Sequence, residues 1–129
     1  MADKEAIRTE EAPAPFQGAP YSQAIRAGGL VFVSGQVALR PGSPELAGAG
    51  IAEQTEQVFA NLRVILEAAG TGLDRVVKTT VYLRDFADFQ GMNDVYRRHV
   101  GDVPPARATV EVSNLPSGAL VEIDAIALA

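Results

Sequence analysis

The chain has 129 residues, of which 47% are hydrophobic and 21% charged, and these values suit one globular domain with a single core. Its formal net charge is -5 and its longest basic run is Arg97-Arg98, which argues against binding to a nucleic-acid backbone. The chain contains no cysteine and a single histidine, His99, so disulfides, thiolate nucleophiles and cysteine-based metal sites are excluded.

Residues 1–15 form an acidic leader rich in Ala and Pro, in which we expect little regular structure, and residues 16–129 are expected to form one domain. The leader has neither the basic start nor the apolar centre of a secretory signal. No apolar run approaches the roughly 18 residues needed to cross a bilayer. Together with the absence of cysteine, these features favour a cytoplasmic protein that binds neither membranes nor nucleic acids.

The first half of the domain predicts a hairpin followed by a helix. Short strands are expected at 22–27 and 30–36, separated by the turn dipeptide Gly28-Gly29. After a loop rich in Pro and Gly, apolar side chains recur every three or four residues from Ile51 to Ala69, which predicts an amphipathic helix.

The second half predicts a strand, a helix and two further strands. The alternating residues 76–83 favour a strand, and a helix is expected from Asp85, whose carboxylate can cap the first turn, to His99. Strands at 106–112 and 119–128 follow, joined by the turn SNLPSG. The order β-β-α-β-α-β-β predicts an α+β domain with two helices on one face of a sheet. The opposite face is then left for solvent, a ligand or another subunit.

An arginine stands among small residues in the segment PPARATVEV (104–112). If the last two strands form a hairpin, Arg107 lies opposite Asp124, and Thr109 lies opposite Glu122 on the same face. Arg107 is then either half of a cross-strand salt bridge with no further role, or a ligand-binding group with Glu122 nearby as an acid or base. Spacing alone favours neither interpretation.

The segment PPARATVEV, followed by VEIDAIA, resembles the signature of the RidA/YjgF family of imine and enamine deaminases. Four further blocks resemble family segments, in the family's order and over nearly the whole chain after residue 16: APYSQAI (19–25), FVSGQV (32–37), VVKTTVYLRD (76–85) and DFQGMNDVY (88–96). The resemblance implies a chorismate mutase-like fold of the trimeric type. In such a homotrimer three subunits pack their sheets inward and leave three clefts between neighbours.

The resemblance also implies an activity, namely the hydrolysis of reactive 2-imino acids and their enamine tautomers to 2-keto acids and ammonia. Expected substrates are 2-aminoacrylate with its tautomer 2-iminopropanoate, and 2-iminobutanoate, and no cofactor or metal is implied. Arg107 would clamp the substrate carboxylate, Glu122 would activate water or relay a proton, and Tyr21 would line the cleft. The remaining residues that the resemblance places at the substrate are Ser34, Gly35, Asn93 and Thr109.

Three residues depart from the family pattern or lack a role in it. Thr109 stands where many members carry Cys, which the hydrolysis does not require, and Asp124 stands where Glu is frequent. His99 is interpreted as a surface residue that complements the negative end of its helix. An alternative function is non-catalytic binding of a small carboxylate such as a 2-keto acid. Chorismate mutase chemistry is disfavoured, because it needs several cations and only Arg107 is expected in the cleft.

Overall fold

The computed structural model describes residues 3–129 and contains two helices, α1 (Ile51–Ala68) and α2 (Phe89–His99). Its six strands are β1 (Glu5–Ile7), β2 (Ala24–Ala27), β3 (Leu30–Gln36), β4 (Val76–Leu83), β5 (Ala106–Glu111) and β6 (Val121–Leu128). Single 3-10 turns, η1 to η4, lie at Phe16–Gly18, Leu73–Arg75, Phe86–Asp88 and Pro116–Gly118.

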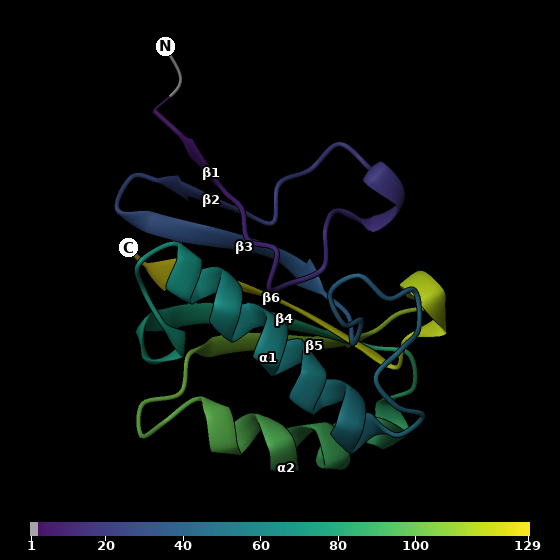
Figure 1. Ribbon diagram of the computed structural model, residues 1–129. Helices are drawn as coiled ribbons and strands as arrows, with labels where there is room; N and C mark the ends of the chain where they lie inside the picture. Colours follow the sequence, from purple (N-terminus) through teal and green to yellow (C-terminus); the bar gives the residue numbers. More distant parts are fainter. Residues whose placement is uncertain (1–2) are drawn as a thin grey trace.

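The strands form one mixed sheet in the order β1-β2-β3-β6-β4-β5. Figure 1 shows α1 and α2 side by side on one face of this sheet, with β1 and β2 at its far edge. The expected α+β architecture, with both helices on one face, is therefore confirmed. The other face carries no helix, and we call it the open face.

The core lies between the sheet and the helices. In α1 the fully buried residues Phe59, Leu62, Ile65 and Leu66 recur at helical spacing, as the sequence pattern predicts. Each such side chain contributes about 1.5–3 kcal/mol through its removal from water. The Asp85 carboxylate accepts a hydrogen bond from the backbone N–H of Ala87 (2.9 Å), as expected for a cap. The first turn is 3-10, however, and α2 itself begins at Phe89.

The hairpin of β2 and β3 is confirmed. Its turn residues Gly28 and Gly29 have φ angles of 59° and 77°, a conformation that residues with a Cβ rarely adopt. The pairing continues beyond this hairpin, because β1 lies antiparallel to β2, with Ala6 opposite Ile25. The leader therefore contributes a strand, where the sequence analysis expected little regular structure. The observed order is β-β-β-α-β-α-β-β.

The expected pairing of the last two strands is wrong. β5 lies parallel to β4 at the sheet edge, and β6 is inserted between β3 and β4. The side chains that β6 turns toward the helices are all buried, which suits a strand paired on both sides: Val121, Ile123, Ala125 and Ala127. The six residues of β5 contain none that is fully buried, which suits an edge strand.

No helix within residues 3–129 is both long enough and apolar enough to cross a membrane.

Candidate functional site

The strand register places the predicted site residues on two different faces of the sheet. Arg107 pairs with Thr79 of β4, whereas Glu122 pairs with Tyr82 of the same strand. Because successive residues of a strand point to opposite faces, Thr79 and Tyr82 lie on opposite faces. Thr79 is 2% exposed and contacts α2 through Tyr96, so Arg107 lies on the helix-covered face. Glu122 lies on the open face, and the expected proximity of Arg107 to Asp124 and Glu122 within one subunit is wrong.

A cleft surrounds Glu122, and four of the predicted residues line it. We call it the Glu122 cleft. It has a volume of about 390 Å³, and its lining residues are Phe16, Ala19, Tyr21, Ser34, Gly35, Pro116 and Glu122. A smaller pocket of about 50 Å³ adjoins it and reaches the leader residues Pro13 and Ala14. The cleft thus combines residues from the segment 16–21, β3, η4 and β6, which lie far apart in the sequence.

Gly35 makes room for the Glu122 carboxylate. A Cβ atom at position 35 would lie 2.3 Å from Oε2 and 2.8 Å from Cδ of Glu122. The register of β3 against β6 shifts between Val33 and Gln36, where β3 contains one more residue than β6. Such bulges redirect side chains next to functional sites. A glycine in this bulge lets Glu122 lie directly against the backbone of β3, and this structural requirement differs from the expected role as a substrate donor.

The Glu122 carboxyl lies in surroundings that favour its neutral form. Partial burial raises the pKa of Glu122, and the negative charge of Asp124, two residues along the same face, raises it further. Asp124 itself accepts a hydrogen bond from the Tyr82 hydroxyl (3.0 Å). Burial, followed by this hydrogen bond, raises the pKa of Tyr82 as well. A carboxyl group whose pKa is shifted toward neutrality is suited to proton transfer at ordinary pH.

Tyr21 and Ser34 are held by backbone contacts. The Tyr21 hydroxyl accepts a hydrogen bond from the backbone N–H of Phe16 (2.6 Å), and its side chain is 43% exposed. The Ser34 hydroxyl donates to the carbonyl of Ser22 (2.6 Å), while the Ser34 backbone N–H donates to the carbonyl of Gln23 (2.9 Å). The Ser34 hydroxyl and its backbone N–H are therefore both used within the fold, whereas the Tyr21 hydroxyl donates no hydrogen bond to another described residue.

The other three predicted residues gather at the edge strand β5, and we call this group the Arg107 edge. The guanidinium of Arg107 lies over the rings of Tyr96 (4.7 Å) and Phe89 (5.6 Å) of α2. Asn93 is half-buried and lies on the same stripe of α2, one helical turn from each ring. Thr109 pairs with Val81 and shares the face of Arg107. Among the described residues, no carboxylate forms a salt bridge with Arg107.

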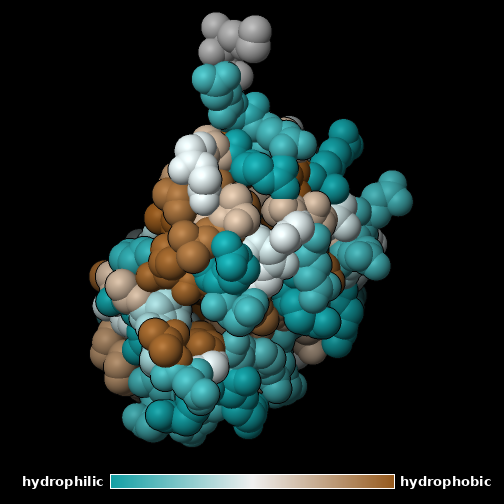
Figure 2. Space-filling view, turned by 90° about the vertical axis from the view of Figure 1, so that its left-hand side faces the viewer, coloured by the Kyte–Doolittle hydropathy of each residue, from teal (hydrophilic) through white to brown (hydrophobic). Residues whose placement is uncertain are grey.

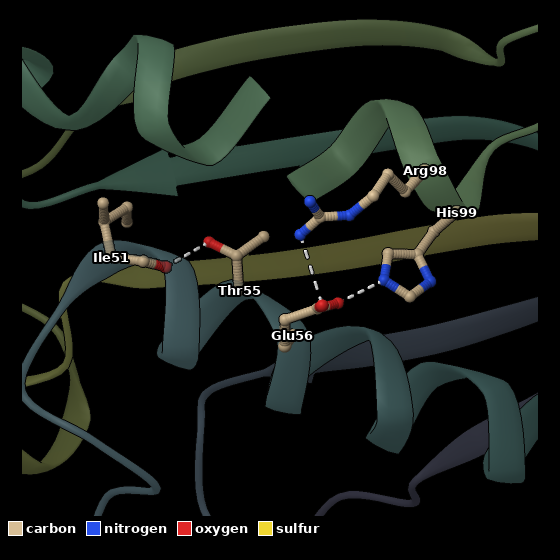
Figure 3. A network of polar contacts seen from close by, with 5 residues as sticks. All are labelled: Ile51, Thr55, Glu56, Arg98 and His99. Carbon is tan, nitrogen blue, oxygen red and sulfur yellow. Dashed lines mark hydrogen bonds and ion pairs between the residues drawn. The ribbon is translucent and has the colours of Figure 1, made fainter. Parts of the chain in front are cut away.

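His99 lies apart from both groups and joins the two helices. Figure 3 shows Glu56 of α1 between Arg98 and His99, both from the last turn of α2. The His99 ring also stacks on Phe59, with centroids 4.6 Å apart. The expected position near the helix C-terminus is confirmed, and the contacts are those of a helix-packing residue. Within residues 3–129, no group of three Asp, Glu or His side chains is arranged to hold a metal ion.

Phe16 and Pro116 also line the Glu122 cleft, although no sequence motif had singled them out. Each lies in a 3-10 turn with two successive left-handed residues, Gln17-Gly18 (φ 53° and 69°) and Ser117-Gly118 (φ 59° and 70°). Non-glycine residues rarely adopt this conformation, and such strain is enriched at functional sites. A similar tripeptide follows each of these two residues, QGA after Phe16 and SGA after Pro116. This repeated pattern is the sequence signal that could have indicated both positions.

Comparisons with known proteins place the chain in a family. A family model described as Endoribonuclease L-PSP matches residues 9–129. A RutC family protein of Pyrococcus horikoshii is 51% identical over 124 residues, covering 96% of this chain and 97% of that protein. The chloroplastic Reactive Intermediate Deaminase A of Arabidopsis thaliana is 44% identical, covering 96% of this chain and 65% of that protein. The crystal structure of E. coli TdcF with bound serine superimposes with a TM-score of 0.89 at 33% identity, covering 97% of this chain and 98% of that one.

The fold and the matched family model define a small α+β domain of the Rid type. The chain belongs to the RidA/YjgF family, as its sequence motifs indicated.

Proposed function

We propose that this chain hydrolyses reactive 2-imino acids and their enamine tautomers to 2-keto acids and ammonia. The observation that carries the proposal is the Glu122 carboxyl, half-buried beside Gly35 and Tyr21 in an open cleft, with its pKa raised by burial and by Asp124. Membership of a family that includes a relative named Reactive Intermediate Deaminase A supports it. The expected substrates are 2-iminopropanoate, with its tautomer 2-aminoacrylate, and 2-iminobutanoate.

In the proposed reaction a water molecule attacks the carbon of the protonated imine, the iminium ion, while the ionised Glu122 carboxylate accepts one of its protons. The resulting carbinolamine carries a hydroxyl and an amino group on the same carbon. Glu122 then returns the proton to the amino nitrogen and the carbon–nitrogen bond breaks, so that ammonia leaves. The hydroxyl proton passes to the Glu122 carboxylate and then to solvent as the keto group forms. Tyr21, whose hydroxyl keeps its proton, donates a hydrogen bond to the water or to the substrate. An enamine first takes up a proton at carbon to become the iminium ion.

The substrate carboxylate needs a cation that the Glu122 cleft of a single subunit lacks. Its lining residues include no Arg or Lys, and Arg107 of the same chain lies on the other face of the sheet. We therefore propose that Arg107 of a neighbouring subunit completes the cleft in a homotrimer, with bidentate hydrogen bonds to the carboxylate. Asn93 and Thr109 would reach the same cleft with it, and Ser34 and Gly35 would form the opposite wall.

The open face supports association through the sheet. Phe32, Val110 and Leu128 are apolar, lie on this face and are each more than 40% exposed. Figure 2 shows apolar side chains gathered toward the left of its view, whereas hydrophilic side chains dominate the right. Exposed apolar side chains on a sheet face without helices favour association through that face.

Two other functions are less well supported. The description of the matched family names an endoribonuclease, but a net charge of -5 and the absence of a basic run disfavour contact with an RNA backbone. A non-catalytic carboxylate-binding protein would need the Arg107 clamp but would not need an acid or base with a raised pKa. Glu122 therefore favours the enzyme.

The test couples the protein to a threonine or serine dehydratase and traps the released imine with semicarbazide. We expect faster release of keto acid and less semicarbazone. Glu122→Gln should keep binding of a 2-keto acid while losing turnover, and Arg107→Ala should lose both. Unchanged keto acid release in the presence of the wild-type protein would disprove the deaminase, and retained 2-keto acid binding would then favour the binding protein.

A further inference from the structure

The leader is attached to the domain through one buried side chain. Gln23 is 4% exposed, and its Oε1 accepts a hydrogen bond from the backbone N–H of Thr9 (2.8 Å). Its Nε2 donates toward the carbonyls of Thr9 (3.0 Å), Ala12 (3.3 Å) and Pro13 (2.8 Å). A single amide group thus fixes the path of five leader residues, and every polar atom of the side chain is used.

The segment that Gln23 fixes continues to Phe16, which is the hydrogen-bond partner of Tyr21. Three residues after Pro13, the backbone N–H of Phe16 donates to the Tyr21 hydroxyl (2.6 Å). A phenol that accepts this hydrogen bond has one side of its oxygen occupied, so its own proton points elsewhere. The hydrogen bond from Phe16 therefore gives Tyr21 the role of a donor toward the Glu122 cleft.

The Tyr21 ring has space to leave this position. Tyr21 also lines a second cavity of about 490 Å³, together with leader residues 6–10, 12, 14 and 15 and with Ser22, Gln23 and Gly42. Tyr21 thus lines two open spaces and is 43% exposed, so packing alone restrains its ring weakly. The backbone N–H of Phe16 holds the hydroxyl at the cleft, and it does so only while the leader keeps its path.

We propose that Gln23 is a positioning residue that sets the orientation of the Tyr21 hydroxyl through the leader, with the segment from Thr9 to Phe16 as the connecting strap. The proposal rests on the proposed function, because it concerns the hydroxyl that donates to the water or the imine. It assigns the leader a role in turnover, in addition to its contribution to the sheet.

A double-mutant cycle tests this coupling. Gln23→Met keeps the side-chain length and removes both polar groups, and we expect kcat to fall about tenfold while KM changes little. Tyr21→Phe removes the oriented hydroxyl. In the Tyr21→Phe background, Gln23→Met should lower kcat by less than about twofold, because its effect passes through that hydroxyl. An equal fall in both backgrounds would show that Gln23 acts by another route and would overturn the proposal.

Gln54→Met provides the matched control. Gln54 is 2% exposed and joins two loops in the same way, donating to the carbonyl of Gly48 (2.9 Å) and accepting from the backbone N–H of Leu120 (2.8 Å). It contacts neither the leader nor Tyr21. We expect Gln23→Met and Gln54→Met to lose a similar amount of thermal stability. The effects of Gln54→Met and Tyr21→Phe on kcat, however, should be additive. Coupling of Gln54 to Tyr21 as strong as that of Gln23 would contradict a specific route through the leader.

A measurement without turnover separates this proposal from the deaminase itself. Amide hydrogen exchange of Phe16 should accelerate in Tyr21→Phe, which loses the acceptor, and in Gln23→Met, which releases the strap, but not in Gln54→Met. Tyr21 is exposed, so Tyr21→Phe is expected to fold normally. Unchanged exchange at Phe16 in both variants would refute the strap even in an active enzyme. Accelerated exchange in a protein without deaminase activity would refute the proposed function alone.

Discussion

The Glu122 cleft and the Arg107 edge differ in what holds their charged group. Glu122 lies against a glycine on the open face and is half-buried near a second carboxylate, so its environment acts on its protonation. Arg107 lies over two aromatic rings on the helix-covered face, and its charge is supported by cation–π contacts. The surroundings of Glu122 suit a group that exchanges a proton, whereas those of Arg107 suit a cation that binds an anion. The sheet separates them, so they can act on one substrate only if two chains meet.

Complementation between two variants gives the largest expected effect. In the proposed homotrimer, the Arg107→Ala and Glu122→Gln variants should each be inactive. Mixed trimers refolded from equal amounts should recover about a quarter of wild-type activity, because one cleft in four receives both intact groups. The measurement is keto acid release in the dehydratase assay. As a control, wild type mixed with the double variant should also show about a quarter for clefts shared between subunits. Inactive mixtures of the two single variants would contradict the shared cleft.

Gly35→Ala tests the close approach on the open face. The added Cβ would overlap the end of the Glu122 side chain, which is flexible and can rotate away. We therefore expect little loss of stability but a fall in kcat of about a hundredfold, because the carboxylate is displaced from the reacting atoms. Thermal unfolding and steady-state kinetics measure the two effects. A wild-type kcat in Gly35→Ala would show that the position of Glu122 against β3 is unimportant for turnover.

The pH dependence of stability tests whether the surroundings of Glu122 disfavour its charged form. The folded-state pKa of Glu122 is raised above its unfolded value, so ionising this group costs stability as pH rises from the unfolded pKa through the folded pKa. Glu122→Gln removes that cost. The subunit carrying Glu122→Gln should therefore gain stability relative to wild type with rising pH and show no such gain in acid. Urea unfolding at several pH values measures the difference, and Arg107→Gln should show no gain of this kind.

Glu56→Gln should give the smallest effect. Glu56 of α1 holds Arg98 and His99 at the end of α2, the helix that lies under Arg107 (Figure 3). The hydrogen bond to His99 is the main cause of the lowered pKa of Glu56. The contribution of Glu56 to the free energy of unfolding is therefore present above its unfolded-state pKa and is lost as pH falls through its folded-state pKa. Such exposed pairs contribute at most about 1 kcal/mol. We expect a small destabilisation near neutral pH that disappears in acid, with keto acid release unchanged. A larger loss would mean that this contact also positions the Arg107 edge.

The local patterns of this sequence determined its elements and its family. Apolar spacing located α1, the pair Gly28-Gly29 located the first hairpin, and Asp85 marked the start of the second helical segment. The motifs around Arg107 and Glu122 indicated the RidA/YjgF family, which the family model confirms. These features depend on residues a few positions apart, so the sequence displays them directly.

Only the tertiary structure decided which strands are neighbours. Nine residues, 112–120, separate β5 from β6, and a hairpin satisfies their local preferences as well as the observed arrangement does. The fully apolar helix-facing side of β6 is buried best between β3 and β4, and β5 is left at the edge, parallel to β4. That choice put Arg107 and Glu122 on opposite faces, and it rests on core burial summed over the whole sheet, which no local pattern contains.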